Sequence, residues 1–329
     1  MSNKKKLGRA KLRAVIIGAG GIASGFDNPN DSSILTHAHA YKKHKQVELA
    51  GFFDIDKKAA NLAAKKWRAK SFVDMDQMFK KINPDLVSVC TPDNTHKEVL
   101  EKIARYGPGL VICEKPVTIL AQNTEEIIEL YKNLNISILV DFSRRFDATM
   151  QDLKKDIEKN KFGKVISASG IYNKGIKHNG SHLIDLALYL FGEAVNLKAF
   201  YCLEDYASDD KSVAGFLQFV NCPQFHLQIF DQRKYSIFEM DILFEKSRIR
   251  LVDFGFKILS QKVEKNPLYA GYYSLSKEAR QKTKLDKALL NLVDNAILHI
   301  QEGAPLICSI NEALKTQKVC EQLLIDLKV

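Results

Sequence analysis

Long apolar runs are absent from this 329-residue chain, since none reaches the roughly 18 residues that a membrane-spanning helix requires. The first ten residues, Met1 to Ala10, are basic but lack an apolar core, which argues against a secretory signal. The six cysteines form no C-x-x-C pair, and several lie within apolar stretches. We therefore expect buried, reduced cysteines in a cytoplasmic protein without membrane contacts.

Acidic residues are absent from the first 13 positions, which carry six of the basic residues behind the net charge of +10. The rest of the chain is close to balance, so this excess predicts a solvated terminal tail. Nucleic-acid binding would require basic residues interleaved with aromatic ones on one face, and this pattern is missing. The mild positive excess suits an anionic cofactor and an anionic substrate.

The first 145 residues alternate short apolar runs with helical patterns, and no internal repeat or low-complexity segment interrupts them. The apolar runs are rich in β-branched side chains, which is typical of strands buried in a parallel sheet. The predicted strands are Leu12–Ile17, Val47–Phe53, Leu86–Cys90, Leu110–Cys113 and Ile136–Val140, and the predicted helices are Ala59–Trp67, Lys97–Arg105 and Glu125–Asn133. This alternation predicts right-handed βαβ units and a doubly wound parallel sheet, the Rossmann arrangement.

The pattern changes after about residue 145, where strand-like runs follow one another with few helices between them. Close spacing of this kind predicts a mostly antiparallel sheet. The predicted strands are Val165–Tyr172, Leu197–Leu203, Val213–Val220, Phe225–Phe230, Ser236–Phe244 and Arg248–Val252; the predicted helices are Gln151–Asn160, Leu183–Phe191, Asp286–Gln301 and Asn311–Leu327. The fold class is therefore α/β, with a Rossmann domain over residues 1–145 and an α+β domain over residues 146–329. The charged stretch Lys277–Lys287 is expected at the surface.

The segment Gly18-Ala19-Gly20-Gly21-Ile22-Ala23 follows the first predicted strand directly. Gly18 permits a tight turn, Gly20 lets the backbone approach a pyrophosphate, and Ala23 takes the place of the third glycine. Backbone N–H groups at the start of a helix attract phosphate. Glycine-rich loops have many uses, but the position after the first strand favours a dinucleotide site formed by residues 18–22.

Asp54 ends the second predicted strand, where a carboxylate can bind the adenosine ribose hydroxyls and repel a 2′-phosphate. It lies 34 residues after Gly20 instead of the usual spacing of about 20, and the polar stretch Phe26–Ile34 explains the excess as an insertion. NAD is therefore the expected cofactor, although Lys57 and Lys58 leave NADP open. A helix N-cap is the alternative role for Asp54.

Two further loops fall at the same edge of the predicted sheet, where open α/β sheets bind ligands. Thr91-Pro92 and His96 follow the third strand as candidate cofactor contacts, although His96 fits an ordinary first-turn helix residue equally well. Glu114-Lys115-Pro116 follows the fourth strand, and Glu114 and Lys115 are further candidate cofactor contacts. The Lys115 ammonium could also polarise a carbonyl or stabilise an alkoxide during hydride transfer. A cis bond at Pro116 would fix this turn, and a plain surface turn is the alternative.

His182 and Asp185 are three residues apart, so a helix places them on one face. An acid beside an imidazole sets its tautomer and raises its basicity, which makes His182 a candidate general acid or base. The spacing of His178, His182 and Asp185 also permits a metal site, but no further ligands support one and we expect none. A structural histidine near a helix start is the remaining interpretation.

These segments together resemble the Gfo/Idh/MocA family, the glucose–fructose oxidoreductase and inositol dehydrogenase group. The residues that carry the resemblance are G-A-G-G-I-A at 18–23, T-P-D-N-T-H at 91–96, C-E-K-P at 113–116, R-R-F at 144–146, G-S-H-L-I-D at 180–185 and G-A-P-L-I-C-S-I-N-E-A-L at 303–314. The resemblance implies an open, mostly antiparallel sheet in the second domain, a nicotinamide cofactor, and a sugar, polyol or nucleotide-sugar substrate. It also implies a homo-oligomer, a dimer or tetramer, built on that sheet.

The resemblance implies that Lys115 and His182 are the catalytic pair, with Asp185 as a neighbour. Many family members have an aspartate four residues before the histidine, where this chain has His178, so the identity of the proton acceptor stays open. The candidate substrate contacts are Lys115, Arg144, Arg145, Tyr172, His178, Asn179, His182 and Asp185. The arginines favour a nucleotide sugar or a sugar acid. A non-catalytic, cofactor- or sugar-binding regulatory protein of the same fold is the alternative function.

Overall fold

The computed structural model describes residues 11–327, which fall into two compact units. The first unit contains the chain up to Phe146 together with Asp286–Leu314, and the second contains Asp147–Leu285 and the residues from Lys315 on. Sequence patterning placed everything after residue 145 in the second domain, whereas residues 286–314 belong to the first unit. Most of the predicted basic tail lies outside the described residues. Within the described part of the chain, no helix is long and apolar enough to cross a membrane.

The first unit is built around a six-stranded parallel sheet in the order β3-β2-β1-β4-β5-β6. Its strands are β1 (Leu12–Ile17), β2 (Val47–Phe53), β3 (Lys70–Phe72), β4 (Leu86–Val89), β5 (Leu110–Cys113) and β6 (Ser137–Val140). The predicted Rossmann sheet is confirmed, with β3 as an addition. The strand order reverses between β1 and β4, and ligands bind open α/β sheets at the carboxyl ends of such strands.

Short polar caps start the first helices of this unit close to the strand ends. The Asp56 carboxylate accepts a hydrogen bond of 2.8 Å from the backbone N–H of Lys58 and so begins α2. Thr36 begins α1 in the same way through the backbone N–H of His39. The helices are α1 (His37–Lys43), α2 (Lys57–Trp67), α3 (Met75–Ile82), α4 (His96–Ala104), α5 (Ala121–Asn133) and α8 (Ala288–Glu302).

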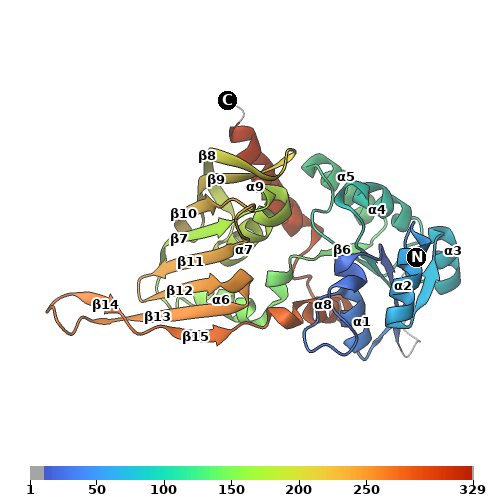
Figure 1. Cartoon of the computed structure of the whole chain (residues 1–329), viewed down its shortest axis with the longest axis horizontal. Helices are drawn as coiled ribbons and strands as arrows, with labels where there is room; N and C mark the ends of the chain where they lie inside the picture. Colours follow the sequence, from blue (N-terminus) through green and yellow to red (C-terminus); the bar gives the residue numbers. More distant parts are fainter. Residues whose placement is uncertain (1–10, 328–329) are drawn as a thin grey trace. The chain divides into compact units, whose positions relative to one another are not determined.

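The second unit contains a nine-stranded sheet in the order β14-β13-β12-β11-β7-β10-β9-β8, with β15 also paired to β13 (Figure 1). Its strands are β7 (Val165–Tyr172), β8 (Ala194–Ala207), β9 (Asp210–Phe219), β10 (Cys222–Ile229), β11 (Phe238–Phe244), β12 (Ser247–Val252), β13 (Lys257–Lys265), β14 (Tyr273–Leu275) and β15 (Ala279–Lys282). Only β7 and β10 pair in parallel, so the predicted mostly antiparallel sheet is confirmed. The stretch Lys277–Lys287, which we expected to be a charged surface segment, contains β15.

Helix α7 (Ser181–Phe191) lies in the core of the second unit, because most of its side chains are apolar and buried. It packs closely on β7: a Cβ atom added to Gly170 would lie 2.7 Å from a methyl carbon of Leu183. The other helices of this unit are α6 (Ala148–Glu158) and α9, which runs over Ile310–Asp326. This packing fixes the segment that carries the predicted histidines.

Candidate functional site

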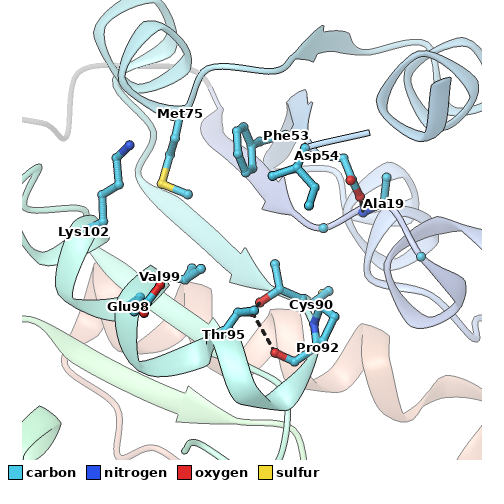
Figure 2. Close-up of a pocket in the computed structure, with 14 residues that line it drawn as sticks. Ala19, Phe53, Asp54, Met75, Cys90, Pro92, Thr95, Glu98, Val99 and Lys102 are labelled. Carbon is cyan, nitrogen blue, oxygen red and sulfur yellow. Dashed lines mark hydrogen bonds between the residues drawn. The ribbon is translucent and has the colours of Figure 1, made fainter. Parts of the chain in front are cut away.

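A pocket of about 610 Å³ opens at the carboxyl edge of the parallel sheet, beside the ends of β1, β2 and β4 (Figure 2). Predicted cofactor residues form one part of its lining: Gly18, Ala19, Gly20, Asp54, Thr91 and Pro92. The remaining lining residues are Phe53, Ile55, Met75, Cys90, Thr95, Glu98, Val99 and Lys102. The sequence indicated the strand-end residues but missed the side chains that α3 and α4 contribute.

The glycine loop has two positions with opposite constraints. Gly18 has a φ of +92°, and a Cβ atom there would lie 2.5 Å from the carbonyl oxygen of Cys90. Only glycine fits this approach between the ends of β1 and β4. At Gly20, by contrast, a Cβ atom would meet nothing within 4 Å, so the backbone faces the open space of the pocket. A phosphate group can therefore approach the backbone at Gly20.

Asp54 connects the end of β2 to the glycine loop. Its Oδ2 accepts a 2.8 Å hydrogen bond from the backbone N–H of Ala19, and its Oδ1 accepts one of 2.9 Å from the N–H of Asp56. Each carboxylate oxygen has a second lone pair, so these bonds leave acceptor capacity toward the pocket. The helix N-cap is Asp56, not Asp54, which removes the alternative role considered for Asp54.

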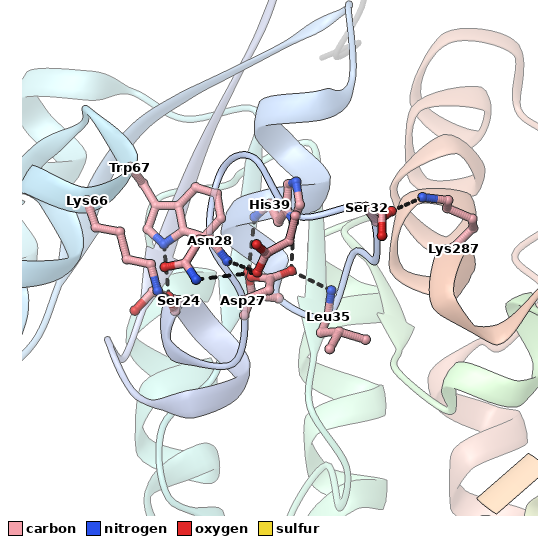
Figure 3. A network of polar contacts seen from close by, with 11 residues as sticks. Ser24, Asp27, Asn28, Ser32, Leu35, His39, Lys66, Trp67 and Lys287 are labelled. Atoms are coloured by element: carbon pink, nitrogen blue, oxygen red, sulfur yellow. Dashed lines mark hydrogen bonds and ion pairs between the residues drawn. The ribbon is translucent and has the colours of Figure 1, made fainter. Parts of the chain in front are cut away.

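The polar stretch Phe26–Ile34, interpreted above as an insertion, is anchored by Asp27 (Figure 3). This carboxylate is 2% exposed and accepts hydrogen bonds of 2.6 Å from the N–H of Leu35 and the hydroxyl of Thr36. It also lies 2.7 Å from Nδ1 of His39. The extra residues thus fold back onto the start of α1. They lengthen the sequence between the glycine loop and β2 while the Ala19–Asp54 contact is kept.

We expect Asp27→Ala to lower the free energy of unfolding by about 3 kcal/mol or more, because each buried polar group that loses its only acceptor costs about 1–3 kcal/mol. The matched control is Asp31→Ala in the same loop. Asp31 is exposed and accepts a 2.8 Å bond from the N–H of Asn28, so we expect a loss below about 1 kcal/mol. Urea unfolding measures both values. Equal losses in the two variants would show that Asp27 is not the anchor.

His96 was predicted as a cofactor contact, but in the structure it connects two loops. It is fully buried and does not line the pocket. Its Nδ1 lies 2.7 Å from the carbonyl oxygen of Pro116, and its Nε2 lies 2.9 Å from that of Thr91. The loop after β4 is fixed further by Thr95, whose hydroxyl donates to the carbonyl oxygen of Pro92 (Figure 2). The Thr91 and Pro116 turns are therefore held in one arrangement.

The Glu114-Lys115-Pro116 turn follows β5, and its Lys115–Pro116 bond is cis, as predicted. The Glu114 side chain lies 2.9 Å from Nε2 of His37, so it anchors the turn. Neither Glu114 nor Lys115 lines the pocket beside the glycine loop, and their roles as cofactor contacts stay predictions. Burial alone would raise the pKa of Glu114, but the hydrogen bond and charge of His37, with the charge of Lys115, lower it overall. Lys115 is half-buried in this turn.

In the second unit, His178, Asn179, His182 and Asp185 lie on one continuous segment formed by the π-helical turn Gly175–Gly180 and α7. Asp210 holds this turn, because its carboxylate accepts hydrogen bonds of 2.8 Å and 2.9 Å from the backbone N–H groups of Lys177 and His178. Asp185 is 1% exposed and accepts a 3.0 Å bond from the Thr316 hydroxyl. Asp210 was missed from the sequence, since it is remote along the chain and has no local motif.

Two predicted substrate contacts are corrected by their surroundings. Tyr172 is fully buried, and its hydroxyl donates to the carbonyl oxygen of Val213 at 2.9 Å and accepts from the N–H of Val213 at 2.7 Å. It therefore joins β7 to β9. Arg145 is 2% exposed, and its Nη1 lies 3.4 Å from a carboxylate oxygen of Glu312 within the first unit. Both side chains stabilise the fold, which leaves Arg144 as the candidate arginine.

Residues 12–142 match a family model described as an oxidoreductase family with an NAD-binding Rossmann fold. This segment therefore matches the model of the Gfo/Idh/MocA family of oxidoreductases. The match covers β1 to β6 and hence every residue that lines the pocket. The resemblance inferred from the sequence motifs is confirmed.

Curated relatives and solved structures extend this likeness. The D-glucoside 3-dehydrogenase of Escherichia coli K12 is 26% identical over 221 residues, which is 60% of this chain and 60% of that protein. The matches to the first curated relatives span between 38% and 60% of those relatives' own lengths. A putative NADPH-dependent oxidoreductase from Desulfitobacterium hafniense has a TM-score of 0.81 at 15% identity, over 97% of this chain and 96% of that one. The WlbA dehydrogenase from Bordetella pertussis, solved with NADH and UDP-GlcNAcA, has a TM-score of 0.77 at 17% identity, over 97% and 96%. These two structures show a common fold across both units.

Proposed function

We propose that this protein is an NAD(P)-dependent dehydrogenase that transfers a hydride between a nicotinamide cofactor and a CH–OH carbon of a sugar-type substrate. The observation that carries the proposal is the pocket in which the open backbone at Gly20 and the Asp54 carboxylate lie together. The backbone of residues 18–20 fits a pyrophosphate, and Asp54 fits the ribose hydroxyls. Asp54 favours NAD, while Lys57 and Lys58 leave NADP as the second cofactor to test.

A bound nicotinamide supplies the acceptor or donor of the hydride. In the proposed reaction, Lys115 stabilises the charge that develops on the substrate oxygen. His182 takes the hydroxyl proton during oxidation and returns it during reduction. His178 stands where many relatives have an aspartate, so Lys115 is the alternative proton acceptor. Asn179 and Arg144 are proposed to contact the substrate.

The proposed substrate is a sugar, a sugar acid or a nucleotide sugar. The names of two related proteins support this class: one relative is a D-glucoside 3-dehydrogenase, and WlbA was solved with UDP-GlcNAcA. We further propose a homo-oligomer, which light scattering of the purified protein tests. The activity test follows NADH absorbance with NAD⁺ or NADP⁺ and a panel of sugars, polyols, sugar acids and nucleotide sugars. A non-catalytic regulatory protein would bind NADH and show no turnover with any of them.

We expect Asp54→Ser to weaken NAD⁺ binding by about tenfold or more, because the acceptor for the ribose hydroxyls is lost. The difference in affinity between NAD⁺ and NADP⁺ should also narrow, because the charge that repels a 2′-phosphate is lost. Asp56→Ser is the matched control, since serine still caps α2. Calorimetric titration with each cofactor gives the two dissociation constants. Unchanged NAD⁺ affinity in Asp54→Ser would exclude this residue from the cofactor site.

A further inference from the structure

A buried polar cluster in the first unit adjoins the turn that carries Lys115. It consists of His37 on α1, Glu114 after β5 and Asp141 after β6. Nε2 of His37 lies 2.9 Å from Oε1 of Glu114 and 3.8 Å from Oδ2 of Asp141. The His37 and Asp141 side chains are almost fully buried, at 0% and 1% exposed. The Glu114 side chain is 14% exposed, so the three charges lie close together with little access to water.

Neighbouring polar groups hold the cluster in place. The other ring nitrogen of His37 lies 3.1 Å from the Ser88 hydroxyl, which is itself 2.6 Å from the hydroxyl of Tyr41. The Ser143 hydroxyl donates a 2.9 Å hydrogen bond to Oδ1 of Asp141. The other titratable groups whose charges act on the cluster are Cys90, His96 and Lys115, and Tyr41 contacts it only through Ser88. Cys90 also lines the pocket, so the cluster and the proposed cofactor site share a wall.

Two carboxylates face one imidazole, so the fully ionised cluster has one excess negative charge in a nearly dry place. A proton is the simplest way to remove an uncompensated buried charge. Burial and then the nearby Glu114 raise the pKa of Asp141 to about 7. Burial opposes charge on His37, but Cys90 and Glu114 raise the pKa of this ring well above its usual range. The extra proton therefore resides on Asp141 below neutral pH, while His37 stays charged.

We propose that His37 and Asp141 are positioning residues for Lys115, and that the cluster they form with Glu114 holds one exchangeable proton which sets the negative charge beside the Lys115 turn. This inference rests on the proposed role of Lys115. When Asp141 gives up its proton, the added negative charge favours the ammonium form of Lys115. Turnover should therefore change with pH through a group that touches neither substrate nor cofactor.

The test is the pH profile of kcat and KM for wild type, Asp141→Asn and a matched control, Asp85→Asn. Asp85 is also a buried aspartate of the first unit, 4% exposed, but it precedes β4 and accepts a 2.9 Å bond from the N–H of Arg13 at the opposite end of the sheet. We expect an inflection in kcat near neutral pH in wild type and Asp85→Asn. In Asp141→Asn this inflection is lost and kcat above it falls by about threefold to tenfold, with KM for NAD⁺ little changed. An unaltered profile in Asp141→Asn overturns the proposal.

A second measurement needs no turnover and so separates failure of this inference from failure of the proposed function. A carboxyl that binds its proton more tightly in the folded state stabilises the fold at low pH, and this stability is lost as the pH rises through the folded pKa. The melting temperature of Asp141→Asn should therefore rise relative to wild type between about pH 4 and pH 7 and level off above that range. Asp85→Asn should show a constant offset. If Asp141→Asn shows only a constant offset as well, the cluster holds no exchangeable proton.

Two observations on wild type keep the inference testable if the variant does not fold. Nitrogen-15 NMR of the His37 ring should show an imidazolium at about pH 7.5, and a neutral ring would overturn the proposal. His37, Glu114 and Asp141 also offer three ligand atoms close enough to share a metal ion. Elemental analysis should find no stoichiometric metal in the purified protein. If the protein contains one equivalent of a metal, and chelators remove it with loss of the His37 signal, the cluster binds a cation in place of the proton. That result would overturn the proposal.

Discussion

Replacement of Lys115 by alanine is expected to lower kcat on a true substrate by about 10²- to 10⁴-fold, which is the usual contribution of a positioned acid–base or charge-stabilising group. The expectation rests on the Lys115 turn, which Glu114 anchors through His37 at the carboxyl end of β5. Because Lys115 does not line the pocket beside the glycine loop, NADH affinity should change by less than about threefold. Steady-state kinetics and an NADH titration on the same protein measure both quantities.

Lys97→Ala is the matched control for the loss of a lysine in the first unit. Lys97 forms an exposed ion pair of 2.5 Å with Glu126, and such pairs contribute little to stability, so turnover should match wild type. Wild-type kcat in Lys115→Ala would remove this residue from the mechanism. The double variant with His182→Ala tells whether the two residues act in the same step. If the two side chains act in one step, their losses in kcat will not add.

The parallel sheet could be predicted because its buried strands are continuous apolar runs. In β1, L-R-A-V-I-I, four successive residues are buried, and that pattern is visible in the sequence. Strand β3 gave no such signal, since Lys70 and Ser71 are exposed and only Phe72 is buried. Strand β15 is exposed throughout and is held by backbone pairing to β13. Hydrophobic patterning cannot detect a strand that buries no side chain.

The candidate site was predictable where it depends on strand ends alone. The carboxyl ends of parallel strands converge at one edge, so the glycine loop and Asp54 could be placed together from the sequence. The contact of His37 with Glu114 joins residues 77 positions apart, and no local pattern encodes it. An available signal was Asp141, an acidic residue directly after the last predicted strand of the sheet and hence at the same edge as Glu114.

Conversely, residue type alone misplaced several side chains. Tyr172 and Arg145 are polar and lie close in sequence to the family motifs, which made them candidate substrate contacts. In the structure, the Tyr172 hydroxyl bonds to the backbone of Val213, and the Arg145 guanidinium forms an ion pair with Glu312. Burial separates such structural roles from binding roles, and burial of a single polar residue follows from tertiary packing, which a sequence pattern does not specify.

The last prediction separates cofactor binding from folding at the glycine loop. We expect Gly20→Val to weaken NADH binding by about 100-fold or more, because the isopropyl group fills the space through which a pyrophosphate approaches the backbone. The fold should tolerate this change. The Gly20 backbone is extended, with φ −75° and ψ −160°, and a Cβ atom there meets nothing within 4 Å. The free energy of unfolding should therefore change by less than about 1 kcal/mol.

Gly18→Ala, two residues away, is expected to behave in the opposite way. The φ of +92° at Gly18 alone costs a side chain about 1–3 kcal/mol, and the approach of 2.5 Å to the carbonyl oxygen of Cys90 adds to that cost. Urea unfolding and NADH titration of both variants give four values. If Gly18→Ala is unstable, and Gly20→Val is stable but binds NADH weakly, the pyrophosphate lies at Gly20. A stable Gly20→Val that binds NADH as tightly as wild type would instead place the cofactor away from this loop, and the proposed dehydrogenase activity would lose the observation on which it rests.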